Sequence, residues 1–395
     1  MDFRLTEDQQ QLRDMTRELA REEFAPLAAE WDQTPGSYPL AALAKLAELG
    51  FLSMAIPEEY GGVGYGAVAN ALVVEELAYA SAALAIMVGV HNTIGAGPIL
   101  KFGSEAQKRE FLPRMAAGEL GAFSLSEPDA GSDVAALTAT ARRDGGDYVL
   151  NGAKNWVTNG AHAQILILFA KTDRAAGNKG ISAFIVERGA KGLVMGKPED
   201  KMGLRGSDTV GLSLTDVRVP AERLLAGEGM GMKIALAALD GGRIGVAAQA
   251  TGVAQAALDE AARYARQRRT FGKLLADHGP VQAMLAEMER RVVASRLMYQ
   301  RAAWLREQGR PFTREAAAAK LYATEAATYV THRAIQVHGG YGYVKEYPVE
   351  RYYRDARVFE IYEGTSEVQR LVIAREAVKR AAEVETRAAS GGIPS

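Results

Sequence analysis

The spacing of apolar residues changes twice along this chain, and that change constrains the fold more than any other feature. Residues 6–120 carry helical spacing, residues 121–231 carry short strand-like runs between turns, and residues 232–380 return to long helices. The order predicts an α+β multidomain protein with an N-terminal α-helical domain (residues 1–120) and a middle β-barrel or sandwich domain (residues 121–231). An antiparallel helical bundle (residues 232–380) and a flexible tail (residues 381–395) follow.

The N-terminal region begins with a helix signal. Thr6 followed by Gln9 is a capping-box pattern, and Leu12, Met15 and Leu19 then fall on one helix face. We therefore expect an amphipathic helix at the start of the chain.

Two further helices are expected in the same region. A long apolar helix runs on from Ala67, and Ser104 with Gln107 repeats the capping-box pattern. The capped helix should end near Gly118, because glycine favours the left-handed backbone that closes a helix.

Turn residues divide the middle region into short strands. The sequence Asp-Gly-Gly-Asp at residues 144–147 predicts a tight turn between two strands, and residues 165–169 are typical of a buried strand. Further apolar runs occupy residues 184–186, 212–214 and 217–219. Short strands separated by turns favour a small barrel or sandwich over βαβ units.

Composition excludes several classes of protein. The chain has no cysteine, which excludes disulfides, thiolate nucleophiles and cysteine-ligated metal clusters. A net charge of -1 disfavours nucleic acid or an anionic membrane as a partner. The first ten residues are polar, unlike a secretory signal, and the apolar runs are shorter than the ~18 residues of a membrane span. Without a signal or a membrane span, we expect a cytoplasmic protein. The five histidines lack metal-ligand spacing, so we expect no metal site.

Two segments of the middle region are candidates for ligand binding. In residues 123–132, FSLSEPDAGS, hydroxyls and backbone N–H groups can converge on a ligand, although an ordinary turn with capping serines explains the segment equally simply. In the second, Trp156 offers a flat wall for a planar ligand, and the Thr158 hydroxyl lies two residues on, on the same strand face. A core tryptophan is the alternative.

A basic segment follows in the bundle region. Residues 264–273, YARQRRTFGK, contain Arg266, Arg268, Arg269 and Lys273 without an acid. A guanidinium at a helix end can clamp a diphosphate, whereas a solvated basic face is the alternative.

The last candidate segments are residues 337–343, VHGGYGY, and residues 359–367, FEIYEGTSE. Glu363 lies in a loop among apolar neighbours, where lost solvation would raise its pKa toward that of a general base. The alternative is an N-cap carboxylate for the helix that begins near Ser366.

Taken together and in this order, the motifs resemble those of the acyl-CoA dehydrogenases. SEPDAGSD, NGAKNWVTNG, YARQRRTFG, QVHGGYGY and IYEGTSE each look like a family motif, and the resemblance extends from about residue 5 to residue 380. It implies an N-terminal helical domain, a middle β-domain and a C-terminal four-helix bundle, assembled as a homotetramer. It also implies non-covalent FAD, an acyl-CoA substrate and electron-transfer flavoprotein as the electron acceptor.

The resemblance also assigns roles to residues. Glu363 matches the catalytic base. The residues that match cofactor-binding positions are Phe123, Leu125, Ser126, Ser132, Trp156, Val157, Thr158, Arg268, Phe271, Gln336, Val337, His338, Gly339, Gly340, Thr365, Ser366 and Glu367. Those that match substrate-binding positions are Ser132, Asp240, Arg243, Tyr362 and Gly364. Several FAD contacts cross subunits in this family, so a monomer should bind FAD poorly.

The implied reaction converts a short- to medium-chain saturated acyl-CoA into the trans-2-enoyl-CoA, with removal of the α-proton by Glu363 and hydride transfer to flavin N5. Asp240-Gly-Gly-Arg243 carries no extra acid, which favours Glu363 over the helix-borne base of some relatives. Residues 91–104 most resemble short-chain members, and Ala85 replaces the arginine of glutaryl-CoA enzymes. Gly279 replaces the glutamine that many relatives place beside the flavin.

Three alternatives remain open at this point. A branched short-chain acyl-CoA dehydrogenase and an acyl-CoA oxidase of the same fold fit the same motifs. A nucleic-acid-associated flavoprotein would call for a basic C-terminal surface, which the interspersed acids and arginines of residues 351–379 disfavour.

Overall fold

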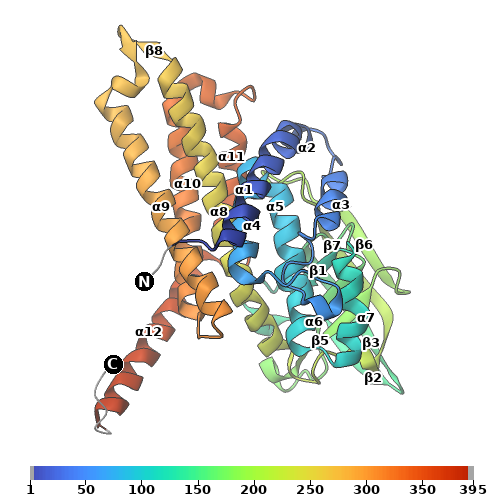
Figure 1. The fold of residues 1–395 in the computed structure, drawn as a ribbon. Helices are drawn as coiled ribbons and strands as arrows, with labels where there is room; N and C mark the ends of the chain where they lie inside the picture. Colours follow the sequence, from blue (N-terminus) through green and yellow to red (C-terminus); the bar gives the residue numbers. More distant parts are fainter. Residues whose placement is uncertain (1–3, 390–395) are drawn as a thin grey trace.

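The computed structural model describes residues 4–389, with the N-terminal helices lying between a sheet and the helices of the C-terminal region (Figure 1). Gln9 N donates to Thr6 Oγ1 (3.2 Å) and Thr6 N donates to Gln9 Oε1 (3.1 Å), which confirms the first capping box. The second, at Ser104 and Gln107, is also confirmed. The elements of this region are α1 (Glu7–Leu19), η1 (Ala20–Phe24), η2 (Ala25–Leu27), α2 (Ala28–Gln33), α3 (Leu40–Glu48), η3 (Glu58–Tyr60), α4 (Gly66–Ala80), α5 (Ala82–Val90), η4 (His91–Gly95), α6 (Ala96–Phe102) and α7 (Glu105–Ala116).

The amphipathic face predicted for α1 is only partly correct. Leu12 is buried and Leu19 packs against the core, but Met15 is 47% exposed. The buried partner of Leu12 is instead Thr16, whose hydroxyl donates to the Leu12 carbonyl oxygen (2.7 Å).

The long apolar helix expected from Ala67 is divided in two at Ser81. Ser81 has extended backbone, ends α4, and accepts a hydrogen bond from Leu84 N (3.3 Å) to cap α5. The alanine-rich flanks hide this break because they favour helix on both sides. The segment Ala82–Phe102 is long and apolar enough to cross a membrane by length and composition only, and 89% of its most apolar window is buried inside the protein.

Among the described residues, seven strands form one curled sheet. Asp144 pairs with Asp147 across Gly145 and Gly146, so the predicted turn is confirmed. The runs 212–214 and 217–219, expected as separate strands, belong to one strand with a bulge at Asp216, whose φ is 51°. The strands are β1 (Gly121–Ser124), β2 (Thr140–Asp144), β3 (Asp147–Thr158), β4 (Ile165–Lys171), β5 (Ile181–Glu187), β6 (Leu193–Pro198) and β7 (Thr209–Pro220), in the order β1-β4-β2-β3-β7-β6 with β5 beside β4.

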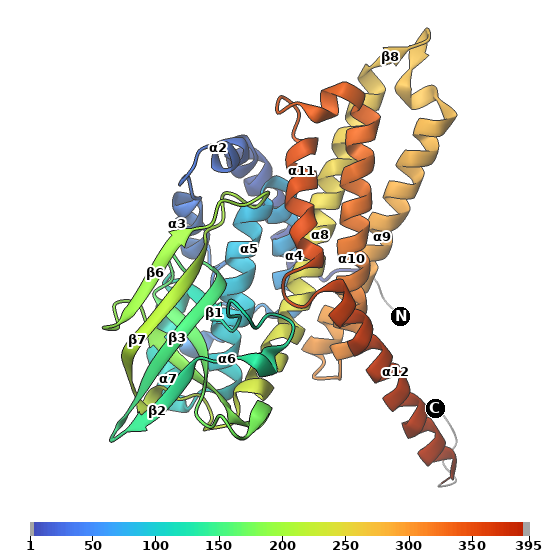
Figure 2. The ribbon, with the colours of Figure 1, turned by 180° about the vertical axis from the view of Figure 1, so that it is seen from behind.

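The C-terminal region is a helical bundle in which α8 (Gly231–Gln267), α9 (Gly279–Glu307) and α10 (Thr313–His338) lie side by side (Figures 1 and 2). A hairpin of β8 (Arg269–Thr270) and β9 (Lys273–Leu274) lies at one end, and α12 (Ser366–Ala389) extends away from the body at the other. The remaining elements are η5 (Val134–Ala136), η6 (Gly177–Gly180), η7 (Ala221–Arg223), η8 (Leu275–Asp277), η9 (Gly339–Tyr343), α11 (Val349–Ala356) and η10 (Arg357–Glu360).

The last helix passes the boundary that the sequence suggested. Residues 381–389 were expected in a flexible tail, but they continue α12, because alanine and glutamate are strong helix formers. Residues 390–395 of that tail lie outside the described residues.

Two hydrophobic cores cross the boundaries between the three sequence regions. The larger core joins α4 and α5 to the bundle helices α8, α9 and α10. The second core joins α6 and α7 to the sheet through residues such as Ile99, Phe111 and Phe169. The helix α8 is thus packed against the N-terminal helices as well as its own bundle.

Candidate active site

Glu363 lies in the short loop between η10 and α12, where its backbone is left-handed with φ of 51°. The cap of α12 is made by Thr365, whose hydroxyl accepts from Val368 N (3.3 Å). Because Thr365 performs this task, the alternative of Glu363 as the capping carboxylate is wrong. The carboxylate is left for another role.

The carboxylate of Glu363 lies in a recess on α8 that a glycine creates. A Cβ atom on Gly242 would overlap Glu363 Oε2, and it would stand 3.2 Å from Ile94 Cγ2. Within residues 4–389, Glu363 Oε2 is buried without a hydrogen-bond partner. A buried, unpaired carboxylate oxygen is costly in a folded protein, so this one is available for a proton or a ligand.

Burial raises the pKa of Glu363 to about 7, although Lys320 and Arg243 both act to lower it. The two cations come from different helices, Arg243 from α8 and Lys320 from α10. Burial outweighs their attraction, so the carboxyl group titrates near neutral pH. This is the range in which a general base both accepts and releases a proton.

Two predicted substrate residues form an ion pair beside the recess. Arg243 is 4% exposed and donates to Asp240 Oδ1, and the Thr313 hydroxyl donates to Asp240 Oδ2 (2.7 Å). Both carboxylate oxygens of Asp240 are therefore engaged within the chain. Direct contact of Asp240 with a substrate remains a prediction.

The loop that carries Glu363 is fixed on both sides. On one side the Tyr362 hydroxyl donates to Gln249 Oε1 on α8. On the other, the Gly364 carbonyl oxygen accepts from Lys320 Nζ and from Gln369 Nε2, each at 2.8 Å. The predicted residues Tyr362, Glu363 and Gly364 thus form one unit.

The π-helical turn η4 connects this recess to the sheet. Ile94 borders the recess at Gly242, and His91 Nδ1 accepts from Gly121 N at the start of β1 (3.0 Å). His91 Nε2 donates to the Leu52 carbonyl oxygen (2.7 Å), and burial lowers its pKa to about 4, so the ring is neutral. The start of β1 and the recess of Glu363 are therefore linked through the single turn η4.

A buried ion pair shapes the loop that leaves β1. Lys154 Nζ on β3 donates to Glu127 Oε1 (2.9 Å) and to the Leu125 carbonyl oxygen (3.1 Å). Glu127 also accepts from Thr138 N (2.6 Å) and Ala139 N (3.0 Å). This network, together with the bond from Asn155 N to the Ser126 carbonyl oxygen (2.9 Å), holds the loop against β3.

The predicted flavin wall lies beside that loop. Trp156 is 61% exposed with φ of 62°, so the alternative of a core tryptophan is wrong. Val157 is fully buried, and Thr158 is partly exposed. Of the other predicted residues here, Phe123 packs on Phe169 (ring centroids 4.9 Å apart), Leu125 is buried, Ser126 is partly exposed and Ser132 is exposed. The exposed indole beside backbone amides fits a planar, hydrogen-bonding cofactor.

The remaining predicted cofactor residues lie at the hairpin end of the bundle. The ring of His338 stacks on Tyr264 with centroids 4.3 Å apart, and Arg268 lies over the Tyr341 ring at 5.7 Å. Phe271 at the hairpin tip is 97% exposed. This end also carries Gln336, Val337, Gly339 and Gly340, at the end of α10 and the start of η9.

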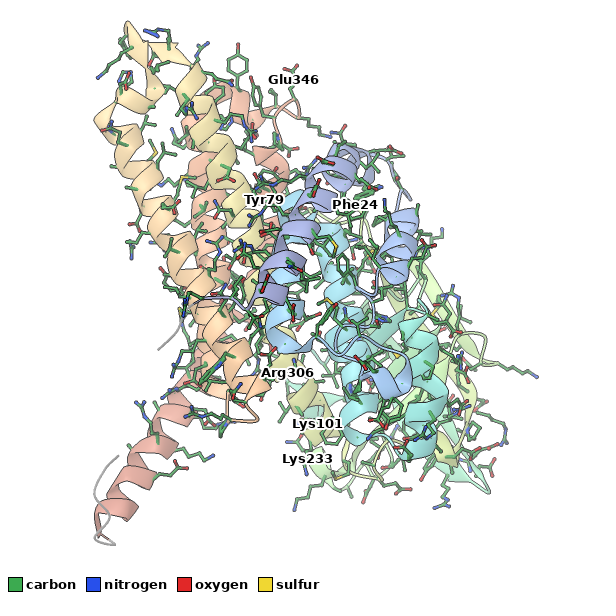
Figure 3. The ribbon with its side chains drawn as sticks, viewed as in Figure 1. Phe24, Tyr79, Lys101, Lys233, Arg306 and Glu346 are labelled. Atoms are coloured by element: carbon green, nitrogen blue, oxygen red, sulfur yellow. The ribbon has the colours of Figure 1, made fainter. Side chains whose placement is uncertain are left out.

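That end is far from Glu363 of the same chain. Gly242 and Arg268 are 26 positions apart along α8 and its C-cap, which is about 39 Å at 1.5 Å per residue. In Figure 3, Glu346, which follows η9, lies near the hairpin end, whereas Arg306, whose guanidinium packs beside Gly241, lies in the other half. One subunit therefore does not bring all predicted FAD residues to one site.

Sequence reasoning missed several residues of the site. Lys320, Gln249 and Gln369 were not singled out, and neither was the Lys154–Glu127 pair. A lone lysine within the alanine-rich run AAAAKLYA was an available signal for Lys320, because an unpaired cation rarely faces an apolar core. The Gly241-Gly242 pair inside a helix was another, since helical glycines often mark a close approach.

Comparison with known proteins agrees with this architecture. Residues 6–119, 122–217 and 229–378 match the N-terminal, middle and C-terminal domain profiles of the acyl-CoA dehydrogenases. The short-chain specific acyl-CoA dehydrogenase of Mus musculus mitochondria is 49% identical over 94% of this chain and 90% of its own length. The acryloyl-CoA reductase (NADH) of Anaerotignum propionicum is 46% identical over 96% of this chain and 97% of its own length.

The fold itself is shared with solved structures. The structure of butyryl-CoA dehydrogenase from Megasphaera elsdenii superimposes with a TM-score of 0.94 at 44% identity, covering 96% of this chain and all of the other. The three domain matches, the relatives and the fold agree with the motifs. The chain therefore belongs to the acyl-CoA dehydrogenase family, FAD-dependent oxidoreductases that dehydrogenate acyl-CoA thioesters.

Proposed function

We propose that this protein oxidises short- to medium-chain saturated acyl-CoA to the trans-2-enoyl-CoA, with Glu363 as the base that removes the α-proton. The observation that carries the proposal is the unpaired Glu363 Oε2 in the Gly242 recess. A carboxyl group with a pKa of about 7 can take up the proton and release it again within one cycle. The short-chain relatives support the substrate class.

The residues of this chain divide the work between positioning and proton transfer. Lys320 and Gln369 hold the Gly364 carbonyl, and Tyr362 is anchored to Gln249. These anchors on both neighbours fix the direction in which the Glu363 carboxylate faces the substrate. Trp156, Thr158 and the loop at Leu125 and Ser126 form the wall on which FAD would lie. When bound, FAD supplies the hydride acceptor of the oxidation. Holding the reacting groups in place removes much of the entropic barrier to the reaction.

The assembly that we propose is a homotetramer in which Arg268, Phe271 and residues 336–340 complete the FAD site of a partner subunit. Two observations support it. The hairpin end is about 39 Å from the recess of its own chain, and α9 and α12 expose apolar side chains on the outside of the bundle. These exposed residues are Val293, Leu297, Trp304, Leu371 and Val378. Such unpartnered apolar surface is typical of a subunit interface.

The test of this function is reduction of the flavin by substrate under anaerobic conditions. Wild-type protein should bleach with butyryl- to octanoyl-CoA, and Glu363→Gln should lose at least ~1,000-fold of the rate, since the proton then has no acceptor. Normal bleaching by Glu363→Gln would refute the assignment of the base.

A matched pair of glycine variants tests the recess. Gly242→Ala should lower the rate about 100-fold, because the carboxylate must leave its place. Gly245→Ala on the same helix serves as the control, because a Cβ there meets no atom of the described residues within 4 Å apart from its own chain neighbours and helix backbone. Equal rates in the two variants would remove the recess from the mechanism.

The reductase relative raises a second candidate, catalysis in the opposite direction. Proton transfer to and from Glu363 is reversible, so the same site could return the proton to an enoyl-CoA.

We propose oxidation with electron-transfer flavoprotein as acceptor, in the cytoplasm. Three assays distinguish the candidates. A dehydrogenase reduces electron-transfer flavoprotein with butyryl-CoA, a reductase consumes NADH with acryloyl-CoA, and an oxidase forms peroxide in air. Isobutyryl-CoA in the same assay tests a branched substrate.

A further inference from the structure

Lys320 is a buried cation that the reaction outlined above does not need as a reactant. It lies on α10, is 0% exposed, and is surrounded in sequence by alanines. Its ammonium group donates to the Gly364 carbonyl oxygen (2.8 Å), one residue after Glu363. Burial lowers the pKa of Lys320 to about 8, while Glu363 acts to raise it. Burying a charged lysine is costly, so a compensating interaction is needed.

The hydrogen bond alone does not explain a charged residue at this position. Gln369 Nε2 already donates to the same carbonyl oxygen (2.8 Å) and is itself fully buried. A neutral donor therefore satisfies the geometry of the loop. What Lys320 adds is positive charge, and Glu363 exerts the strongest electrostatic attraction on it.

Other charged groups face the same space from each neighbouring element. Arg243 on α8 also acts on Glu363, but its charge is shared with Asp240 through their ion pair. Glu360 on η10 and Glu367 in the first turn of α12 also raise the pKa of Lys320 by their negative charge. The charge of Glu363 raises the pKa of the Tyr362 hydroxyl. Lys320 is the larger of the two cationic influences on Glu363.

We propose that Lys320 is a positioning residue for the catalytic base, whose ammonium group fixes the Gly364 carbonyl and keeps the Glu363 carboxylate ionised in the Gly242 recess. The inference rests on the proposed function, because it requires Glu363 to be the base. The attraction between opposite charges lowers the cost of ionising Glu363 in a site where desolvation opposes it. The lysine thus sets the pH range over which the base is active.

The experiment measures the pH dependence of anaerobic flavin bleaching by butyryl-CoA in four holoenzymes. These are the wild type, Lys320→Gln, Lys320→Arg and Gln369→Met. Lys320→Gln keeps a hydrogen-bond donor and loses the charge, so the pKa of Glu363 should rise. The acidic limb of the pH–rate profile should therefore move about one pH unit upward. Its rate should then be about tenfold below wild type at pH 6 and within twofold of it at pH 9.

The other two variants separate charge from hydrogen bonding. Lys320→Arg keeps the charge and should restore the wild-type acidic limb. Gln369→Met removes the other donor to Gly364 without changing charge, so it should lower the rate at every pH and leave the limb in place. A limb that moves equally in Lys320→Gln and Gln369→Met would overturn the inference, as would a shifted limb in Lys320→Arg.

The outcome for Glu363→Gln separates this inference from the proposed function. If Glu363→Gln keeps normal turnover, the assignment of the base fails and the inference fails with it. If Glu363→Gln is inactive and Lys320→Gln has the wild-type limb, only the inference fails. A readout without turnover is the pH dependence of unfolding of Lys320→Gln against Lys320→Gln/Glu363→Gln. The stability difference between them should begin at the same pH as in the Lys320 background, but it should keep growing to a pH about one unit higher.

Discussion

At the scale of single residues, the site combines backbone strain with buried charge. Trp156, Phe271 and Glu363 all have positive φ (62°, 49° and 51°), a region that bulky residues rarely adopt. All three belong to segments that the sequence marked as candidates for ligand binding. Strain of this kind persists where the surroundings over-determine the conformation, as the anchors on Tyr362 and Gly364 do for Glu363.

The raised pKa of Glu363 predicts a cost to stability that depends on pH. Its folded-state pKa is about 7 against an ordinary value of 4.5, so the folded protein binds the proton more tightly than the unfolded chain. Stability from this group is therefore full below pH ~4.5 and falls as the pH rises toward 7. Glu363→Gln should unfold with a free energy ~2 to 3 kcal/mol higher than wild type near pH 7.5.

Urea unfolding at several pH values checks this prediction. The difference between the two proteins should shrink as the pH falls and vanish below pH ~4.5, where Glu363 is protonated in both folded and unfolded states. A difference that stays constant with pH would contradict the raised pKa.

At the scale of elements, the sequence identified local signals well and missed those that depend on partners. Both capping boxes and the Asp144–Asp147 turn are decided within a few residues, and each was predicted correctly. The break at Ser81 and the single strand β7 depend on packing and on pairing with β3, which single-sequence spacing does not contain. The motifs singled out Glu363, but Lys320 and Gln369 contact the neighbouring Gly364 carbonyl from the helices α10 and α12, and no local motif connects them with that loop.

The loop after β1 is an element whose shape depends on one buried ion pair, Lys154 with Glu127. Lys154→Met should leave Glu127 buried beside an uncharged chain and destabilise the protein by about 3 to 5 kcal/mol. Because the same lysine holds the Leu125 carbonyl, the variant should also lose FAD more readily.

The measurement is the flavin content of purified protein after gel filtration, with thermal unfolding alongside. Lys171→Met is the matched control, since Lys171 on β4 also donates to a backbone carbonyl oxygen, that of Ala135 in η5 (3.0 Å), but is partly exposed to solvent. Equal loss of FAD in both variants would show that the buried pair has no special part in cofactor binding.

At the scale of the whole molecule, the predicted FAD residues fall into separate groups. The sheet residues and Glu363 are joined through η4, whereas Arg268 and Phe271 lie at the far end of the bundle. The resemblance to the family implied that some FAD contacts cross subunits, and the arrangement in space shows which of the predicted residues one chain brings together. The length of α8 separates the two groups, so the division follows once that helix is known to be continuous.

A mixing experiment tests whether the groups belong to different subunits. Glu363→Gln and Arg268→Ala should each be inactive as pure proteins. After joint refolding, a subunit with intact Glu363 can pair with a partner that has intact Arg268. Random mixing should then restore about a quarter of the wild-type sites. No recovery after verified mixing of subunits would place Arg268 in the site of its own chain.

The two cores that cross the sequence regions also bear on how such a chain can change during evolution. Residues 96–116 belong by sequence to the helical N-terminal region but pack with the sheet, and α4 and α5 pack with the bundle. A recombination event at residue 120 would therefore separate buried partners on both sides of the junction. Exchange of any one region alone would therefore expose apolar side chains that the other two now cover, so the three regions depend on one another for their stability.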